Sequence, residues 1–153
     1  MAKYYKDDKT QADPVEHLRN FVFALNKEED NATVIIMTRE IARSAGFGST
    51  DEVMIATAVS ELSTNILRYA SCGTVIISTI LGNGRTGIEI RAEDKGPGIR
   101  NLDLAMQDNF STSESLGLGL SSVERIMDTF EIESDAGRGT RVEARKWLQR
   151  NLW

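Results

Sequence analysis

EDKGPGIRNLDLAMQDNFSTSESLGLGLSSVERIM, residues 93–127, is the stretch of sequence that decides the fold of this chain. It leaves an alternating strand at Asp94, passes Gly96 and Gly98, and crosses a loop of small and hydroxyl residues. It then enters an amphipathic helix through Gly117-Leu118-Gly119. Glycine lets the backbone approach a ligand because it has no Cβ, and a glycine-rich helix start offers N–H groups to phosphate. We therefore expect a nucleotide that runs from Asp94, which accepts from the base, to Gly117–Gly119, which hold the phosphates.

The composition is typical of one soluble globular domain. The chain has 153 residues, of which 41% are hydrophobic and 27% are charged, and its net charge is −5. This charge argues against a nucleic-acid binder. No apolar run approaches the roughly 20 residues of a membrane span, and the N-terminus lacks a signal-peptide pattern. The single cysteine, Cys72, cannot form an internal disulfide, which favours a cytoplasmic location; a nucleophilic role for it is disfavoured because the only histidine, His17, is far away in sequence.

The first part of the chain predicts an arm, a strand and two helices. Residues 1–14 are polar and predict a flexible N-terminal arm, whereas residues 15–153 predict one domain. We expect an edge strand at residues 18–25. The first helix begins near Asn26 or Asp30, both possible N-caps, and ends at Gly46. The second helix has about twenty residues and is opened by a capping box of Ser49 and Glu52.

The second helix carries an apolar stripe and a polar pair beside it. Glu61 and Asn65 lie one turn apart on the flank of the stripe, where they point along the seam between helix and sheet. A cleft could open there. The stripe residues are Ile55, Val59, Leu62, Ile66 and Tyr69.

The rest of the chain predicts a sheet with helices on one face. Strands at residues 74–81 and 87–94 flank Asn83-Gly84, a strong hairpin signal, and the second of them alternates between a buried and a wet face. Short helices at 102–107 and 118–129 precede a last hairpin at 130–147. This order predicts an α/β (α+β) two-layer sandwich, in which a mixed, largely antiparallel sheet is covered by helices on one face.

Two common phosphate loops are disfavoured by the spacing. No G-K-[ST] sequence occurs, so a Walker-type loop is absent. A Rossmann loop should join a strand directly to a helix, whereas many residues separate Gly98 from Gly117. Taken singly, the glycine pairs could be plain turns, and Glu61 with Asn65 could be a hydrogen-bonding pair on a helix flank.

Order and spacing taken together resemble the GHKL ATPase superfamily, with its Bergerat (histidine-kinase-like ATPase) fold. Four motifs occur in its order, over about residues 15–148. They are Glu61-x-x-x-Asn65, Asp94-x-Gly96-x-Gly98-Ile99, Gly117-x-Gly119 and Gly137-x-Gly139-Thr140. The segments AGFGSTDEVMIATAVSELSTNILRYA, AEDKGPGI and FSTSESLGLGL resemble more closely the RsbT-type serine/threonine kinases, the switch kinases of bacterial stressosomes.

This resemblance implies roles for individual residues in binding ATP and Mg²⁺. Asn65 is expected to hold Mg²⁺, Asp94 to accept from the adenine amino group, and Thr140 to support the same edge. Glu61 is expected to take the proton from an attacking hydroxyl. The remaining nucleotide-binding residues are expected in the glycine loop, a lid and the helix start: Gly96, Gly98, Ile99, Ser111, Thr112, Ser113, Gly117, Leu118, Gly119 and Leu120.

The resemblance also implies partners. The chain is expected to phosphorylate a STAS-domain antagonist protein of a stressosome and, when released, to bind and activate a PP2C-type phosphatase, with no nucleic acid or membrane involved. No Lys or Arg lies between Arg100 and Arg125, although anti-sigma kinases tend to have a basic residue near the γ-phosphate. This favours the RsbT-type interpretation and a slow intrinsic kinase. Two alternatives stay open: an anti-sigma factor with kinase activity (RsbW- or SpoIIAB-like), and a nucleotide-sensing module without turnover.

Overall fold

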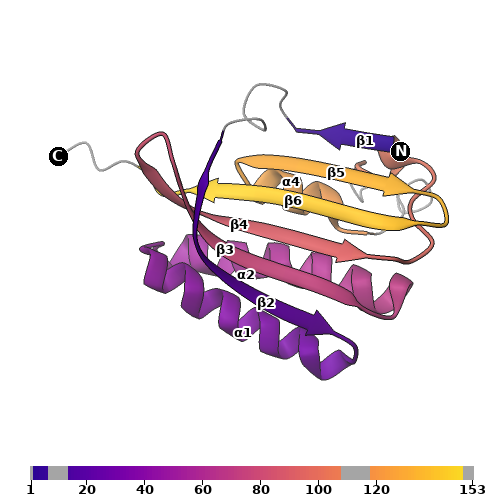
Figure 1. Ribbon diagram of the computed structural model, residues 1–153, viewed down its shortest axis with the longest axis horizontal. Helices are drawn as coiled ribbons and strands as arrows, with labels where there is room; N and C mark the ends of the chain where they lie inside the picture. The colour runs from indigo at the N-terminus through magenta and orange to yellow at the C-terminus, as the bar shows by residue number, and fades with distance from the viewer. Residues whose placement is uncertain (1, 7–13, 108–117, 150–153) are drawn as a thin grey trace.

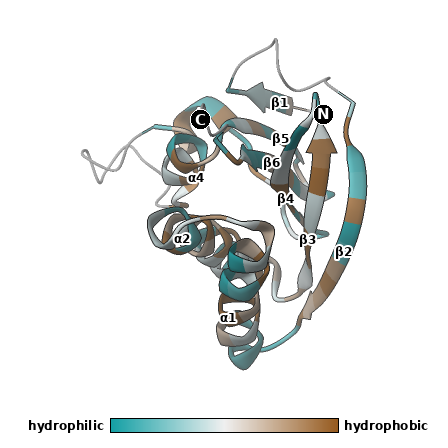
Figure 2. Cartoon of the chain, turned by 90° about the vertical axis from the view of Figure 1, so that its left-hand side faces the viewer, coloured by the Kyte–Doolittle hydropathy of each residue, from teal (hydrophilic) through white to brown (hydrophobic). Residues whose placement is uncertain are grey.

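The protein forms two layers, a six-stranded sheet and a set of helices that cover one of its faces (Figures 1 and 2). The computed structural model describes residues 2–6, 14–107 and 118–149. The strand order is β1-β5-β6-β4-β3-β2. The elements are β1 (Ala2–Tyr5), β2 (Glu16–Leu25), α1 (Glu28–Ala45), α2 (Ser49–Asn65), the π-helix η1 (Ile66–Ala70), β3 (Gly73–Gly82), β4 (Arg85–Asp94), α3 (Leu102–Ala105), α4 (Leu120–Ile126), β5 (Thr129–Asp135) and β6 (Gly139–Trp147).

The predicted two-layer architecture is confirmed, but the sheet is not mixed in the described part of the chain. Every strand pairing there is antiparallel. The reason lies in the connections. The chain runs along the sheet in α1 and returns in α2. Strand β3 therefore starts opposite the end of β2, with Leu25 beside Gly73. A single crossover helix would have made these two strands parallel.

The hairpin and the first helix form as their local sequences predict. Asn83 and Gly84 both have positive φ, at 51° and 73°, as a two-residue hairpin turn requires. Helix α1 has Lys27 as its N-cap, and Asp30 accepts from the backbone N–H of Lys27 at 3.1 Å. It ends at Gly46, which has the left-handed conformation with φ 107°. Asp30 therefore lies in the first turn and accepts a hydrogen bond from the N-cap residue, and it is not the N-cap itself.

The predicted capping box at the second helix is wrong. Helix α2 has Gly48 as its N-cap, without a side-chain cap. The Glu52 side chain instead pairs with Arg39 and Arg43 of α1, at 3.1 and 2.8 Å. Two guanidinium groups from the neighbouring helix outcompete a single backbone N–H, because charge-assisted hydrogen bonds are the stronger ones.

The core lies between the sheet and the helices. It contains the predicted stripe residues Ile55, Val59 and Leu62 of α2, together with inward residues of the strands such as Ile90 and Ile132. Figure 2 shows the helices and the sheet as two layers, with hydrophobic (brown) residues in both. None of the helices in the described part of the chain is long and apolar enough to cross a membrane.

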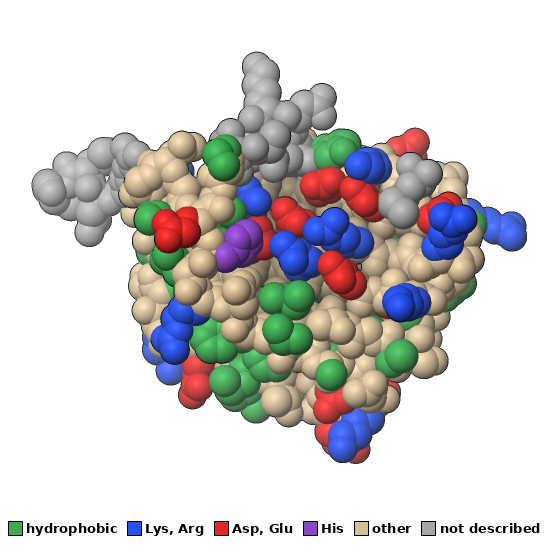
Figure 3. Space-filling view, in the orientation of Figure 1, with side chains coloured by type: hydrophobic (Ala, Val, Ile, Leu, Met, Phe, Trp, Pro, Cys, Tyr) green, Lys and Arg blue, Asp and Glu red, His purple; other side chains and the backbone are tan. Residues whose placement is uncertain are grey.

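The outer face of the sheet carries a network of charges (Figure 3). The expectation of a wet face on the strand at residues 87–94 is wrong at Glu89 of β4, whose side chain is only 2% exposed. Arg145 donates to it at 2.9 Å, and His17 lies at the same distance. Arg145 comes from β6, the neighbour of β4, and His17 comes from β2, two strands away. Together they shield Glu89, and Arg145 compensates its charge.

The expectation of a loose arm at residues 1–14 is wrong for its beginning. Ala2–Tyr5 form β1, which pairs along β5 with Tyr4 opposite Ile132. The exposed backbone edge of β5 offers hydrogen bonds to any extended segment, and the polar composition of the arm does not prevent backbone pairing. The arm's first residues are therefore part of the sheet.

Candidate nucleotide-binding site

A cavity of about 430 Å³ opens between α2, the sheet and the loop that follows β4. Its size lies within the range of small-molecule sites, roughly 300–1,000 Å³. Most of its lining is apolar, and the polar side chains of Asn65, Asp94, Asn101 and Thr140 interrupt it. The apolar residues of the lining include Leu62, Ile66, Ala92, Ile99, Leu104, Leu118, Leu120 and Val142.

Asp94 lies at the end of β4, directly opposite Thr140 of β6. Its Oδ1 accepts from the Gly96 N–H at 2.8 Å. Burial raises the pKa of this carboxyl, and the hydrogen bonds from the backbone N–H groups of Gly96 and Thr140 oppose that rise. The site thus holds a half-buried acceptor in a mostly apolar slot, which suits recognition of an exocyclic amino group.

Thr140 belongs to a hydrogen-bond network that the sequence did not reveal. Its hydroxyl lies 2.9 Å from the Ser134 hydroxyl. Ser134 is 1% exposed and accepts from the Ile99 N–H at 2.7 Å. This serine therefore ties the loop after β4 to the last hairpin. The signal in the sequence is a hydroxyl at an inward position of β5, after Phe130 and Ile132.

Three of the predicted glycines are required by contacts within the protein. A Cβ at Gly96 would lie 2.6 Å from the Ala70 Cβ. At Gly98, which has φ +75°, a Cβ would collide with the Asp135 carbonyl, and at Gly139 it would collide with the backbone of Asp94. Gly96 thus lets the loop after β4 approach η1, and Gly98 and Gly139 let that loop and the last hairpin pack backbone to backbone around Asp94.

Glu61 and Asn65 lie one turn apart on α2, as predicted, and both reach the start of α4. The Asn65 Nδ2 donates to the Leu118 carbonyl at 2.7 Å, which leaves Oδ1 as the atom able to hold a metal ion. A Cβ at Gly119 would fall on the Glu61 carboxylate, and Gly119 has φ +68°. Gly119 is also the N-cap of α4, so this helix begins two residues later than we expected.

The last turn after α2 is a π-helix, η1, and this changes the predicted stripe. Its Ile66 is buried, but Tyr69 is 46% exposed at the edge of the cavity. A π-helix has a wider turn than an α-helix, which rotates Tyr69 out of the apolar arc. Such turns occur frequently at functional sites.

The cavity lining contains residues that the motifs did not indicate. One of them is Arg100, which together with the predicted Asp94 makes up the charged residues among those described around the cavity. Tyr69, Pro97 and Asn101 also line it. The predicted residues Ser111, Thr112, Ser113 and Gly117 lie outside the described part of the chain.

These features fit a purine nucleotide bound with a metal ion. A half-buried carboxylate faces an apolar slot for the base, and an amide oxygen lies one turn from Glu61. Amide oxygens are hard ligands suited to Mg²⁺. The glycine at the start of α4 keeps space beside Glu61 that any side chain would fill.

Comparison with known proteins agrees with this geometry. Residues 50–150 match the family described as histidine kinase-, DNA gyrase B-, and HSP90-like ATPase. The chain is 47% identical over 111 residues to the serine/threonine-protein kinase RsbT of Bacillus subtilis (strain 168), covering 72% of this chain and 84% of RsbT. It is 36% identical over 103 residues to an anti-sigma F factor of Caldanaerobacter subterraneus, covering 63% and 71%. A similar factor of Bacillus thuringiensis (strain Al Hakam) is 38% identical over 101 residues, covering 61% and 68%.

Proposed function

Because this chain belongs to the family of histidine kinase-, DNA gyrase B- and HSP90-like ATPases, in its branch of RsbT-type serine/threonine kinases, we propose that it uses ATP to phosphorylate a STAS-domain antagonist protein. One observation carries the proposal. A single cavity is lined by Asp94, by Asn65 and by the start of α4 at Leu118 and Leu120. There Asn65 donates to the Leu118 carbonyl, and Glu61 lies against Gly119 beside the lining. This is the arrangement needed to hold a nucleotide by its base and present its phosphates.

Asp94 sets the choice of base. Its carboxylate accepts from the adenine amino group, with Thr140 beside it. Guanine would place a carbonyl oxygen against the same carboxylate, and a buried polar mismatch of this kind is worth about 1–3 kcal/mol. The Ser134 network keeps Thr140 and the glycine loop in register with Asp94.

Glu61 and Asn65 act at the phosphate end. Asn65 Oδ1 would hold Mg²⁺, which supplies positive charge to the phosphate oxygens when bound. Glu61 takes the proton from the serine or threonine hydroxyl of the partner, and such base catalysis typically contributes about 10² to 10⁴ in rate. The backbone N–H groups at Leu118–Leu120 offer further hydrogen bonds to phosphate.

The proposal includes an exchange of partners, in which one surface of the kinase binds two proteins in turn. By similarity to the RsbT-type kinases, phosphorylation of the STAS-domain protein releases the kinase, which then binds and activates a PP2C-type phosphatase. A cytoplasmic location stays a prediction of the sequence.

The test is mass spectrometry of a STAS-domain partner co-expressed with the wild-type chain and with Glu61→Ala. A single phosphorylated serine or threonine that is lost with the variant supports the proposal. If the partner stays unphosphorylated with wild type while ATP-Mg²⁺ binds in calorimetry, the chain is a nucleotide-sensing module instead.

The second candidate is an anti-sigma factor with kinase activity. It is favoured by the identity of 36% to an anti-sigma F factor, although the identity to RsbT is higher. A pull-down with the sigma factors of the source cell separates the two. Stoichiometric capture of a sigma factor supports the second candidate, and its absence together with phosphorylation of a STAS-domain protein supports the first.

A further inference from the structure

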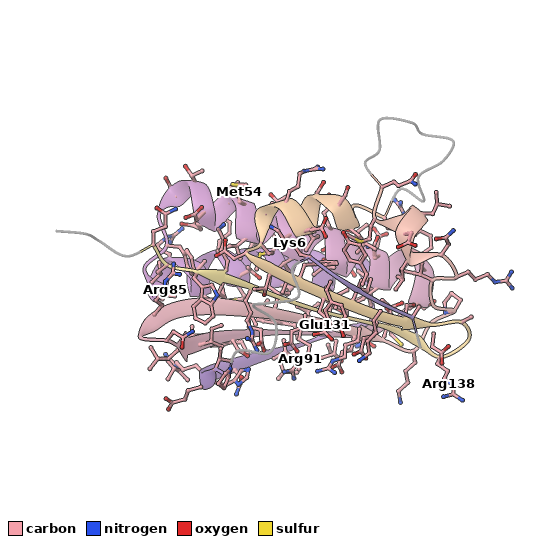
Figure 4. All side chains as sticks on the ribbon, turned by 90° about the horizontal axis from the view of Figure 1, so that it is seen from above. Lys6, Met54, Arg85, Arg91, Glu131 and Arg138 are labelled. Carbon is pink, nitrogen blue, oxygen red and sulfur yellow. The ribbon has the colours of Figure 1, made fainter. Side chains whose placement is uncertain are left out.

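The N-terminal segment, residues 2–6, is attached to the far end of α4. Side chains alternate along β1 and Lys6, the residue directly after it, whose N–H donates to the Phe130 carbonyl at 3.0 Å. Tyr4 and Lys6 contact the helix layer, whereas Lys3 pairs with Glu133 at 2.9 Å. The Lys6 ammonium donates to the carbonyls of Glu124 and Met127, at 2.7 and 2.6 Å. In Figure 4, Lys6 lies on the helix side of the sheet, beside α4, whereas Arg91 and Glu131 lie on the opposite side.

These carbonyls need a partner from outside the helix. The chain turns away after Met127, and the Asp128 N–H donates to the Arg145 carbonyl at 2.8 Å instead of continuing the helix. The last carbonyls of a helix are left without helical donors and carry its negative dipole end. Lys6 supplies positive charge and donors there, and Lys146 donates to the Ile126 carbonyl at 2.9 Å.

Tyr4 strengthens the same attachment. Its ring packs edge-on against Phe130, with centroids 6.2 Å apart. Its hydroxyl hydrogen-bonds to the Glu124 carboxylate, and this contact with burial raises the pKa of Tyr4 to about 12. Backbone pairing with β5 and the Tyr4 ring therefore hold β1 on the sheet, and the Tyr4 hydroxyl and the Lys6 ammonium attach this segment to the end of α4.

The other end of α4 is the nucleotide end. The helix has only seven residues, about 10 Å in length. Its N-cap Gly119 lies against Glu61, and the preceding Leu118 carbonyl accepts from Asn65. A short helix moves as one body, so a shift at its C-terminal end displaces the backbone N–H groups at its start.

We propose that Lys6 and the strand β1 that directly precedes it are positioning elements for the nucleotide, which set where α4 presents its N-terminal backbone to the phosphates. This inference rests on the proposed function. Lys6 donates to the carbonyls at the C-terminal end of α4 and would act on the nucleotide through that helix. The expected effect of losing this attachment is specific. The affinity for the phosphates changes, whereas recognition of the base at Asp94 does not.

The test compares the full-length Lys6→Met, Lys6→Arg and Lys3→Met variants with wild type. Calorimetry measures the binding of ATP-Mg²⁺ and of adenosine, well below the melting temperature of each protein. A displacement of an ångström in a site can lower function about 100-fold, and for a helix still attached through β5 we expect about a tenfold weaker ATP affinity in Lys6→Met. Adenosine affinity stays unchanged, and Lys6→Arg, which keeps the cation, recovers most of the loss.

Lys3→Met is the matched control, because it removes a lysine of the same N-terminal segment whose partner is Glu133 of β5 rather than α4. It should bind ATP as wild type does. The inference is overturned if Lys6→Met binds ATP as tightly as wild type, if Lys3→Met weakens it equally, or if adenosine affinity falls in parallel with ATP affinity. If wild type itself binds no ATP, the proposed function fails first, and hydrogen exchange of the peptide covering residues 118–127 still tests the attachment: faster exchange in Lys6→Met than in Lys3→Met supports it, and equal exchange overturns it.

Discussion

Replacing Asp94 with asparagine tests the base end of the cavity. In the wild-type chain the Oδ1 of Asp94 accepts from the Gly96 N–H at 2.8 Å, and the Thr140 N–H also donates to the carboxylate. A carboxylate has about four lone-pair sites, so acceptor capacity remains for the amino group of adenine. Asparagine keeps one oxygen for the loop, but its NH₂ group then faces the NH₂ group of the base.

The expected loss follows from hydrogen-bond energies. A hydrogen bond to a charged acceptor is worth about 1.5–3 kcal/mol, and an unsatisfied buried donor costs about 1–3 kcal/mol. The site is only half-buried, so we expect about 3 kcal/mol in total, which corresponds to roughly a 100-fold weaker Kd. Calorimetric titration with ATP-Mg²⁺ at neutral pH measures this loss.

The same substitution should not weaken the fold. Burial raises the pKa of Asp94 above its ordinary value of 3.8, so the folded chain binds this proton more tightly than the unfolded chain. The contribution of Asp94 to the free energy of unfolding therefore falls as the pH rises through the interval between the ordinary and the raised pKa. At neutral pH the charged carboxylate is unfavourable for folding, and Asp94→Asn should melt at the wild-type temperature or higher.

Acidification provides an independent check on the wild-type chain. Protonation of Asp94 removes its acceptor charge, so ATP affinity should fall as the pH drops through the raised pKa, and earlier than for an exposed aspartate. Asp94→Asn should lack this dependence. The assignment of Asp94 to the base is refuted if the variant binds ATP within about twofold of wild type, a difference of only about 0.4 kcal/mol.

Three further substitutions test the rest of the site. Glu61→Gln should lower the rate of phosphate transfer to a STAS-domain partner by about 10² to 10⁴ while leaving ATP affinity in calorimetry nearly unchanged; an unaltered rate would remove Glu61 from the chemistry. Gly119→Ala forces a left-handed conformation on a residue with a Cβ and pushes that Cβ into the Glu61 carboxylate. The melting temperature should therefore fall by about 4 °C, and ATP binding should be lost. Normal ATP binding would show that the backbone at the start of α4 can adopt another conformation. Arg100→Gln should weaken ATP binding about threefold but not adenosine binding, with Lys95→Gln on the same loop as its control; equal effects on both nucleosides and nucleotides would exclude a phosphate contact.

Much of the fold could be predicted because its signals are local. The Asn83-Gly84 turn, the stop of α1 at Gly46 and the apolar stripe of α2 each depend on the conformations and burial that neighbouring residues favour. The spacing of Glu61 and Asn65 on one helix likewise placed both on one flank. Asp94 and Thr140 line one cavity because β4 and β6 pair with these two residues opposite each other.

The sequence by itself thus determined most of the elements and most of their buried faces, and it indicated Asn65, Asp94 and Thr140, which line one cavity. Only the tertiary structure decided which polar groups became partners. Glu52 pairs with the arginines of α1, Ser134 binds the Ile99 N–H, and Lys6 binds the end of α4. The physical reason is that hydrophobic periodicity and turn conformation act within a few residues, whereas the partner of a polar side chain depends on which distant segments the packed layers bring within hydrogen-bond distance.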